Sequence, residues 1–268
     1  AAIEKNETAV TDSFRIVRQI APGILLIGNL GAAQFSEYSN FGEQEILKAV
    51  ELIKADAFAI HVNLLQEIIQ PEGDQHFKGF FKKLNNIAKN FNIPIILKEV
   101  GSGFSKEDAK LVQNSSFAGI DIGGLGGTSW AGVETIRAEQ IGNRLIKEVG
   151  NIFWDWGIPT AISVVEVRSV MDKVLIATGG VRNGLQAAKL IALGANIVGI
   201  ALPLLKAAKK GEQELDFFVN KFIRELKTAM FLSGCKKLSD LKNAPLVVRG
   251  YSKDWLQQRG LRHCLKIN

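Results

Sequence analysis

Six short, almost wholly apolar segments recur along the chain, and several end in glycine or a polar residue. Parallel strands that are buried on both faces show this near-continuous apolar pattern instead of strict alternation. The pattern therefore predicts six parallel strands. They lie within residues 23–31, 56–63, 93–101, 117–127, 173–181 and 195–203.

Apolar residues at helical spacing lie between these segments, with clear stripes within 46–53 and 77–91. Residues 105–108 resemble a capping box, and 183–196 fit a helix that ends at Gly194. The region 128–172 should hold extra helices on the rim. Since no linker or low-complexity tract interrupts the chain, we expect one domain over residues 1–268.

Strand–helix alternation of this kind predicts an α/β fold with a parallel sheet. A doubly wound sheet is possible, but polar residues and glycines gather where the predicted strands end. That is the location of active sites in (β/α)₈ TIM barrels. We therefore favour such a barrel. Because only six strands are predicted, the first two would be absent from this chain, most simply from before Ala1.

Composition narrows the class of protein. The 268 residues are 47% hydrophobic, which suits a sizeable core. The net charge is +6, but basic and acidic residues are interspersed, so we expect no nucleic-acid partner. Two cysteines, Cys235 and Cys264, suggest a reducing compartment. A polar N-terminus and the lack of a long apolar run predict a cytoplasmic protein without a membrane segment.

The segment ATGGVRNG at 177–184 is a candidate phosphate site. Gly179 and Gly180 would let backbone N–H groups approach a phosphate, and Arg182 would add a charged fork. The alternative is a tight turn whose glycines serve only the backbone. The segment GIALP follows at 199–203, as in barrels that grip phosphate with the loops after strands 7 and 8. We favour phosphate binding.

Taken together, the strand ends resemble those of one enzyme family. The series IGNLG, HVNxxQE, LKEVG, GGxGGTSW, ATGGVRNG and GIALP is similar to that of the type 2, FMN-dependent isopentenyl-diphosphate isomerases. The resemblance covers residues 1 to about 260 and makes IGNLG the third barrel strand. Family members carry roughly a further third of chain before this point.

The resemblance implies where FMN would bind. Its phosphate would lie on the glycine pair and Arg182, and two side chains would flank the isoalloxazine ring. The residues concerned are Gly179, Gly180, Arg182, Ala201 and Leu202 for the phosphate, and Asn29 and Lys98 for the ring.

Two of these expectations have physical alternatives. A cation such as Lys98 near the pyrimidine edge would stabilise anionic reduced flavin, although a lysine snorkelling from a strand end is common. Thr128 and Ser129 could hydrogen-bond the flavin or merely cap a helix that begins at Trp130. The sequence does not separate these two roles.

The stretch after the second predicted strand, residues 61–74, is unusually polar for a strand end. We expect His61, Asn63 and Gln66 to bind substrate and Glu67 to hold Mg²⁺ together with a diphosphate. Gln66 is the predicted catalytic residue because it can orient an alkene or relay a proton, although it has no useful pKa. Singly, each could be a structural residue or part of an exposed first helical turn.

The implied activity is the redox-neutral conversion of isopentenyl diphosphate to dimethylallyl diphosphate with reduced FMN, Mg²⁺ and NADPH as reductant. Family members commonly form homo-oligomers, often tetramers. The alternatives are an FMN-dependent oxidoreductase, such as a hydroxy-acid oxidase or a nucleotide-precursor dehydrogenase, and a non-catalytic barrel. Such oxidoreductases need a positioned His or Cys, which GGLGGTSW lacks.

Overall fold

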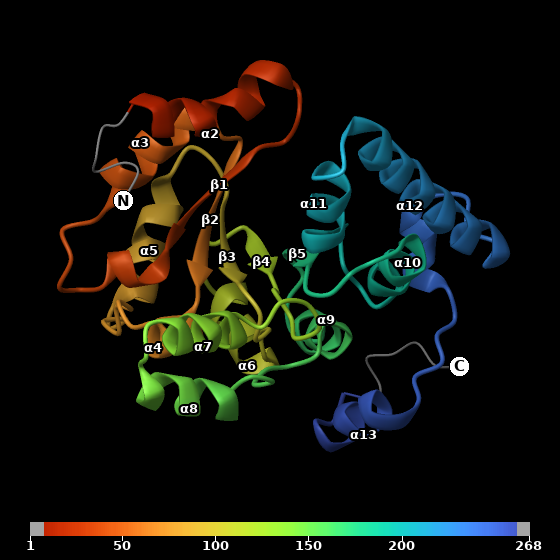
Figure 1. Cartoon of the computed structure of the whole chain (residues 1–268). Helices are drawn as coiled ribbons and strands as arrows, with labels where there is room; N and C mark the ends of the chain where they lie inside the picture. Colours follow the sequence, from red (N-terminus) through yellow and green to blue (C-terminus); the bar gives the residue numbers. More distant parts are fainter. Residues whose placement is uncertain (1–7, 262–268) are drawn as a thin grey trace.

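The computed structural model describes residues 8–261. Its centre is a sheet of six parallel strands whose spatial order is their order in the chain (Figure 1). The strands are β1 (Ile27–Gly31), β2 (Ala57–Val62), β3 (Ile95–Glu99), β4 (Gly119–Asp121), β5 (Val174–Ala177) and β6 (Ile197–Val198).

The strand order decides between the two expected architectures. A doubly wound sheet reverses its strand order at a switch point. Here each strand pairs in parallel with the next, and no reversal occurs. The sheet is therefore the arc of a (β/α)₈ barrel, with two strands fewer than the eight of a closed barrel. Within residues 8–261 no pairing joins β6 to β1, so both are edges.

All six predicted strands are confirmed, but they are shorter than the apolar runs that predict them. The run at 23–31 forms a strand only from Ile27, because Ile24 and Leu25 precede the ladder and are exposed. The run at 195–203 contributes only the two residues of β6, which pairs on one side only. An edge position is not the whole reason, because β4 pairs on both sides and has only three residues.

Helices connect the strands. The predicted caps are confirmed, and the stripe at 46–53 lies within a helix, but the stripe at 77–91 is helical only from Phe80 to Asn90. Ser105 caps its helix through the N–H of Asp108, and Gly194 follows the predicted helix at φ 120°. The region 128–172 holds three helices, α7 to α9. The helices are α2 (Thr8–Ile20), α3 (Glu43–Ile53), α4 (Leu64–Ile69), α5 (Phe80–Asn90), α6 (Lys106–Gln113), α7 (Trp130–Gln140), α8 (Arg144–Ile152), α9 (Thr160–Arg168), α10 (Gly184–Ala192), α11 (Leu202–Ala208), α12 (Glu212–Leu232) and α13 (Gly250–Gln258).

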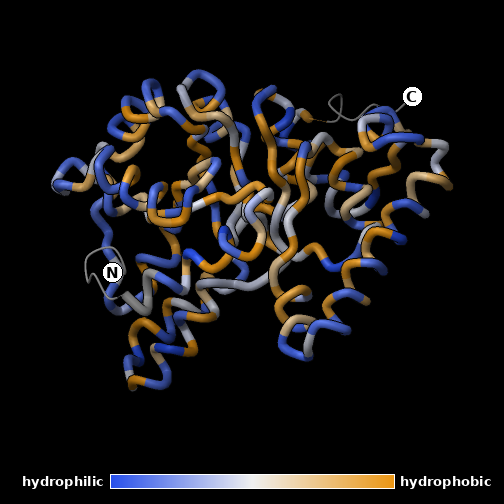
Figure 2. The backbone as a smooth tube through the Cα atoms, turned by 90° about the horizontal axis from the view of Figure 1, so that it is seen from above, coloured by the Kyte–Doolittle hydropathy of each residue, from blue (hydrophilic) through white to orange (hydrophobic). Residues whose placement is uncertain are grey.

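The two faces of the sheet have different environments. One face packs against the helices in the main apolar core, which includes Phe58, Leu97 and Leu175. The other face forms a small separate cluster from Ala59, Ile96 and Ile176. This second face is the lumen of the barrel. Figure 2 shows apolar colour along the strands and alternating colours along the surrounding helices.

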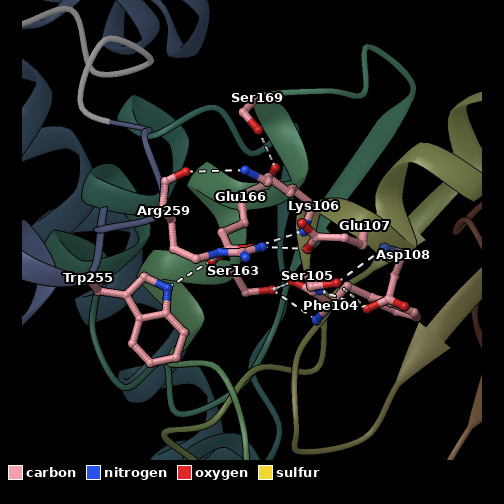
Figure 3. Close-up of polar contacts among 10 residues, drawn as sticks. All are labelled: Phe104, Ser105, Lys106, Glu107, Asp108, Ser163, Glu166, Ser169, Trp255 and Arg259. Atoms are coloured by element: carbon pink, nitrogen blue, oxygen red, sulfur yellow. Dashed lines mark hydrogen bonds and ion pairs between the residues drawn. The ribbon is translucent and has the colours of Figure 1, made fainter. Parts of the chain in front are cut away.

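The C-terminal helix α13 is fastened to the barrel through a buried carboxylate on α9. Arg259 donates to both oxygens of Glu166, each at 3.0 Å, and Trp255 Nε1 donates at 2.8 Å. The backbone N–H of Lys106, at the start of α6, donates to the same carboxylate at 3.0 Å. Glu166 therefore joins three helices (Figure 3).

None of the helices in the described part of the chain is long and apolar enough to cross a membrane. Cys235 carries a free thiol, whereas Cys264 lies outside the described residues.

Replacing Glu166 by Gln should destabilise the protein by roughly 3 kcal/mol, because it removes the buried partner of Arg259 and leaves that charge only the exposed carboxylate of Glu107. Glu107→Gln is the matched control: this carboxylate also pairs with Arg259 but is 58% exposed, so its loss should matter far less. Urea unfolding monitored by circular dichroism measures both variants. Equal stability of the two would contradict the buried anchor.

The ion pair between Glu166 and Arg259 also predicts that the stability of the protein depends on pH. Burial raises the pKa of Glu166, but the hydrogen bonds from Arg259, Trp255 and Lys106 outweigh it and hold the pKa below its ordinary value. A depressed pKa means stability that is present above the ordinary glutamate pKa of about 4.3 and is lost as pH falls through the folded value. The stability difference between wild type and Glu166→Gln should therefore shrink in acid.

Candidate functional site

A row of polar side chains crosses the lumen where the strands end. Strand register places His61 opposite Lys98 and Lys98 opposite Asp121. Lys98 Nζ lies 3.2 Å from Asp121 Oδ2, and the Thr178 hydroxyl donates to Asp121 Oδ1. Lys98 is therefore held on the lumen side in an ion pair, as the functional interpretation requires, and does not snorkel away from the barrel.

His61 lies at the edge of this row against β1. A Cβ added at Gly31 would lie 3.1 Å from His61 Nε2, so the glycine leaves room for the imidazole. Burial lowers the pKa of His61, while the Glu67 charge opposes this and the Lys98 charge adds to it. The ring is therefore neutral at pH 7, with one nitrogen available to donate and one to accept.

The polar stretch after β2 forms one connected wall. Asn63 ends the strand, and its buried Nδ2 donates to Glu67 Oε1 at 2.7 Å. The second oxygen of Glu67 accepts from the N–H of Asp74 at 2.8 Å. Asn63 Oδ1 is buried and has no hydrogen-bond partner among the described residues. This oxygen can accept a hydrogen bond from a water or from a ligand that enters the site.

Gln66 brings in a residue that the sequence analysis missed. Its Nε2 donates to Glu134 Oε1 at 3.2 Å, and Glu134 is almost fully buried. Arg137, one helical turn further along α7, donates to Glu134 Oε2 at 2.6 Å. The signal in the sequence was weak, because Glu134 lies 68 residues from Gln66 in an ordinary helix. Figure 1 shows α4 and α7 side by side below the strand ends.

Two glycine loops meet backbone to backbone on the other side of the lumen. A Cβ at Gly179 would lie 2.1 Å from the carbonyl oxygen of Gly124, and one at Gly180 would lie 2.0 Å from that of Gly126. Both residues also have positive φ, at 110° and 76°. No other residue type fits here, so part of the glycine signal serves the packing of these loops.

Arg182 lies beside both loops. Its Nη1 donates to the carbonyl of Gly180 at 2.7 Å, and its Nη2 donates to that of Gly126 at 3.1 Å. Helix α10 begins two residues later with Asn183 as its cap. A guanidinium and a glycine turn thus lie together, and these donors suit a phosphate. The first N–H of α10, that of Gly184, already donates to the Glu225 carboxylate at 2.8 Å.

Five predicted residues remain to be placed, namely Asn29, Thr128, Ser129, Ala201 and Leu202. Ser129 caps α7, because its hydroxyl accepts from the N–H of Gly132 and donates to the Trp154 carbonyl, whereas Thr128 is exposed. The capping role is therefore confirmed for Ser129, and Thr128 is the more available of the two. Asn29 is exposed on β1, and Ala201 and Leu202 follow β6 at the start of α11.

The volume of the hollows in the structure does not single out this site. A cavity of about 510 Å³ lies along α12, between Leu185 and Leu232, and it contains none of the predicted residues. A hollow of about 470 Å³ lies against the loop at 125–129 and Trp154. The geometry of the strand ends therefore identifies the candidate site better than cavity volume does.

The fold and this site define a class of flavin-binding barrels. The family model described as FMN-dependent dehydrogenase matches residues 43–248. A crystal structure of lactate oxidase from Pediococcus acidilactici matches with a TM-score of 0.61 over 89% of this chain and 65% of its own, at 18% identity. A mandelate oxidase variant matches with a TM-score of 0.57 over 85% of this chain and 71% of its own, at 15% identity. At such identities these two structures confirm only the barrel fold.

Relatives of higher identity specify the family. A protein of Thermococcus kodakarensis is 49% identical over 263 residues, which is 97% of this chain and 68% of the relative. One of Methanocaldococcus jannaschii is 47% identical over 97% of this chain and 71% of its own length. Both are named isopentenyl-diphosphate delta-isomerase. The chain belongs to the isopentenyl-diphosphate delta-isomerase family, which confirms the resemblance, and the family-model match supports FMN dependence.

The residues present fit FMN. The glycine loops and Arg182 could supply donors for its phosphate, and Lys98 could supply a cation in the lumen. For Mg²⁺ the fit is partial. Within residues 8–261 no group of three or more His, Cys, Asp or Glu side chains is arranged to hold a metal. Mg²⁺ often takes one or two carboxylates plus substrate phosphate oxygens, and Glu67 suits that arrangement.

Proposed function

We propose that this protein catalyses the redox-neutral isomerisation of isopentenyl diphosphate to dimethylallyl diphosphate. The observation that carries the proposal is the wall of Asn63, Gln66 and Glu67, which stands at the strand ends beside Lys98 and contains an orphan buried acceptor. The family of the chain supports it. The reaction adds a proton to one carbon and removes one from another, so it needs positioning and proton exchange without a net oxidant.

FMN in its reduced form would supply acid–base chemistry at the ring. The chain would bind its phosphate at Gly179, Gly180 and Arg182, with Ala201 and Leu202 completing the grip. Asn29 and Lys98 would flank the ring, with Thr128 contributing a hydrogen bond and Ser129 holding the loop. Lys98 stabilises negative charge in the lumen, and its ion pair with Asp121 keeps it there. NADPH is the proposed reductant that brings FMN to its active form.

The diphosphate would be held on the β2 side of the lumen. Glu67 would share Mg²⁺ with diphosphate oxygens, and the neutral ring of His61 would donate a hydrogen bond without adding a charge. Asn63 keeps Glu67 in place through its 2.7 Å hydrogen bond. Neutral donors suit this substrate because the diphosphate must be bound without being made a better leaving group.

Gln66 would face the alkene and orient it. Its amide is fixed from behind by Glu134, which is in turn held by Arg137. A glutamine has no useful pKa, so Gln66 cannot be the principal acid. Fixed in this way, it can hold the substrate double bond beside the flavin or relay a proton by hydrogen bonding.

An FMN-dependent oxidoreductase remains the alternative function. Such an enzyme needs a positioned base or nucleophile, typically His or Cys. The glycine loop at 123–129 contains neither, and Cys235 follows α12 in the chain. His61 does lie at a strand end, and it would have to serve as the base of such an oxidoreductase. We also propose that the protein works in the cytoplasm, without a nucleic-acid partner, as a homo-oligomer, for which the family resemblance suggests a tetramer.

The stoichiometry of NADPH separates the two functions. With FMN, Mg²⁺ and isopentenyl diphosphate, the protein should form many equivalents of dimethylallyl diphosphate for each NADPH oxidised, because the reductant only activates the flavin. Product measured by proton NMR, which separates the two isomers by their alkene and methyl signals, and NADPH measured by absorbance give the ratio under anaerobic conditions. A ratio near one would show net oxidation or reduction, and absence of any product would favour a non-catalytic barrel.

The neighbours Gln66 and Glu67 should respond differently to substitution. Residues that are adjacent on a helix diverge by roughly 100°, so one can face the alkene and the other the metal. Gln66→Ala should lower kcat with little change in the Mg²⁺ concentration for half-maximal rate. Glu67→Gln should raise that concentration about tenfold or more, because it removes the charge and keeps the shape.

Magnesium titrations of initial rate decide this division of roles. Glu139→Gln is the matched control, since its carboxylate is 59% exposed and pairs with Lys147 on the outer surface. It should behave as wild type. If Gln66→Ala and Glu67→Gln shift together, or if either loses its flavin, the assignment is wrong.

A further inference from the structure

Helix α9 carries three buried polar residues at a spacing of three. Thr160, Ser163 and Glu166 are 8%, 0% and 0% exposed. Burying a polar group costs free energy unless it is hydrogen-bonded, so each should have a structural partner. The partners show what the helix holds in place.

Ser163 and Glu166 hold the segment after β3. The Ser163 hydroxyl accepts from the N–H of Phe104 at 3.0 Å and donates to the carbonyl of the same residue at 2.7 Å. The Glu166 carboxylate accepts from the N–H of Lys106, two residues after Phe104, and from Arg259 at the end of α13. Figure 3 shows these contacts side by side along α9. Ser163 and Glu166 therefore anchor α9 to the segment after β3 and to α13.

Thr160, at the start of α9, reaches both glycine loops. Its hydroxyl lies 2.7 Å from the carbonyl oxygen of Gly179 and 3.3 Å from that of Leu125. Its backbone N–H also donates to Leu125, at 3.1 Å. The hydroxyl fits because both loops lack side chains there: a Cβ at Gly124 or Gly179 would lie 2.6 or 2.7 Å from Thr160 Oγ1.

The hydrogen bond to Gly179 also fixes the direction of a donor. In a trans peptide the carbonyl of one residue and the N–H of the next point in opposite directions. With the Gly179 carbonyl held toward α9, the N–H of Gly180 points away from the helix. Glycines at positive φ have little conformational preference of their own, so an outside contact must select the orientation.

We propose that Thr160 is a positioning residue for the FMN phosphate. Its hydroxyl sets the orientation of the Gly179–Gly180 peptide and ties it to the loop at 124–127, while Ser163 and Glu166 hold the helix that carries it. This inference rests on the proposed function, because it takes the glycine loops as the phosphate site.

The test compares FMN affinities by fluorescence titration of the apoprotein. Thr160→Val keeps the shape and removes the donor, so FMN should bind about tenfold or more weakly. Thr160→Ser keeps the hydroxyl and should stay within about threefold of wild type. Thr135→Val is the matched control, because that buried hydroxyl bonds only the Ala131 carbonyl of its own helix and should leave FMN affinity unchanged.

Two further measurements separate the possible outcomes. Arg182→Ala, measured alongside, should also weaken FMN binding; if neither Arg182→Ala nor Thr160→Val does so, the proposed phosphate site itself is wrong. If Arg182→Ala weakens binding and Thr160→Val does not, only the positioning role is overturned. A purely structural role would lower the melting temperature of Thr160→Val without changing FMN affinity. Should Thr160→Val fail to fold, Thr160→Ala removes the same hydroxyl with less bulk and is judged by the same criteria.

Discussion

The close approach of two glycine loops is the constraint on which the rest of this site depends. The backbones at 124–127 and 179–180 touch where any Cβ would collide, and Thr160 and Arg182 bond to carbonyls of both loops. The loops end neighbouring strands, so their contact sets the shape of one side of the lumen mouth.

The opposite side of the mouth is built from side chains instead of backbone. Asn63, Gln66, Glu67 and Glu134 form a hydrogen-bonded chain between α4 and α7, and the row from His61 through Lys98 to Asp121 connects it to the middle of the sheet. The register of parallel strands places these residues at one level. One side can therefore hold a cofactor phosphate while the other presents polar groups to a second ligand.

Much of the fold was predictable, because buried parallel strands leave near-continuous apolar runs and helices leave stripes. The strand lengths were not predictable, because the extent of β6 and of β1 depends on pairing with a neighbouring strand, which a local pattern does not show. The candidate residues at the strand ends could be singled out from the sequence because a polar group after an apolar run is locally conspicuous. Glu134 and Thr160 were missed: each acts through a contact more than 15 residues away, to Gln66 and Gly179. Ser129 was ambiguous because a cap and a ligand contact use the same residue type.

The central claim is that this site moves protons on a diphosphate substrate without net redox change. The most direct measurement is proton NMR of the reaction in D₂O, with isopentenyl diphosphate, Mg²⁺ and dithionite-reduced FMN. The account predicts dimethylallyl diphosphate that carries solvent deuterium on the carbon that gains the proton. Product free of deuterium, or a product of changed oxidation state, would contradict it.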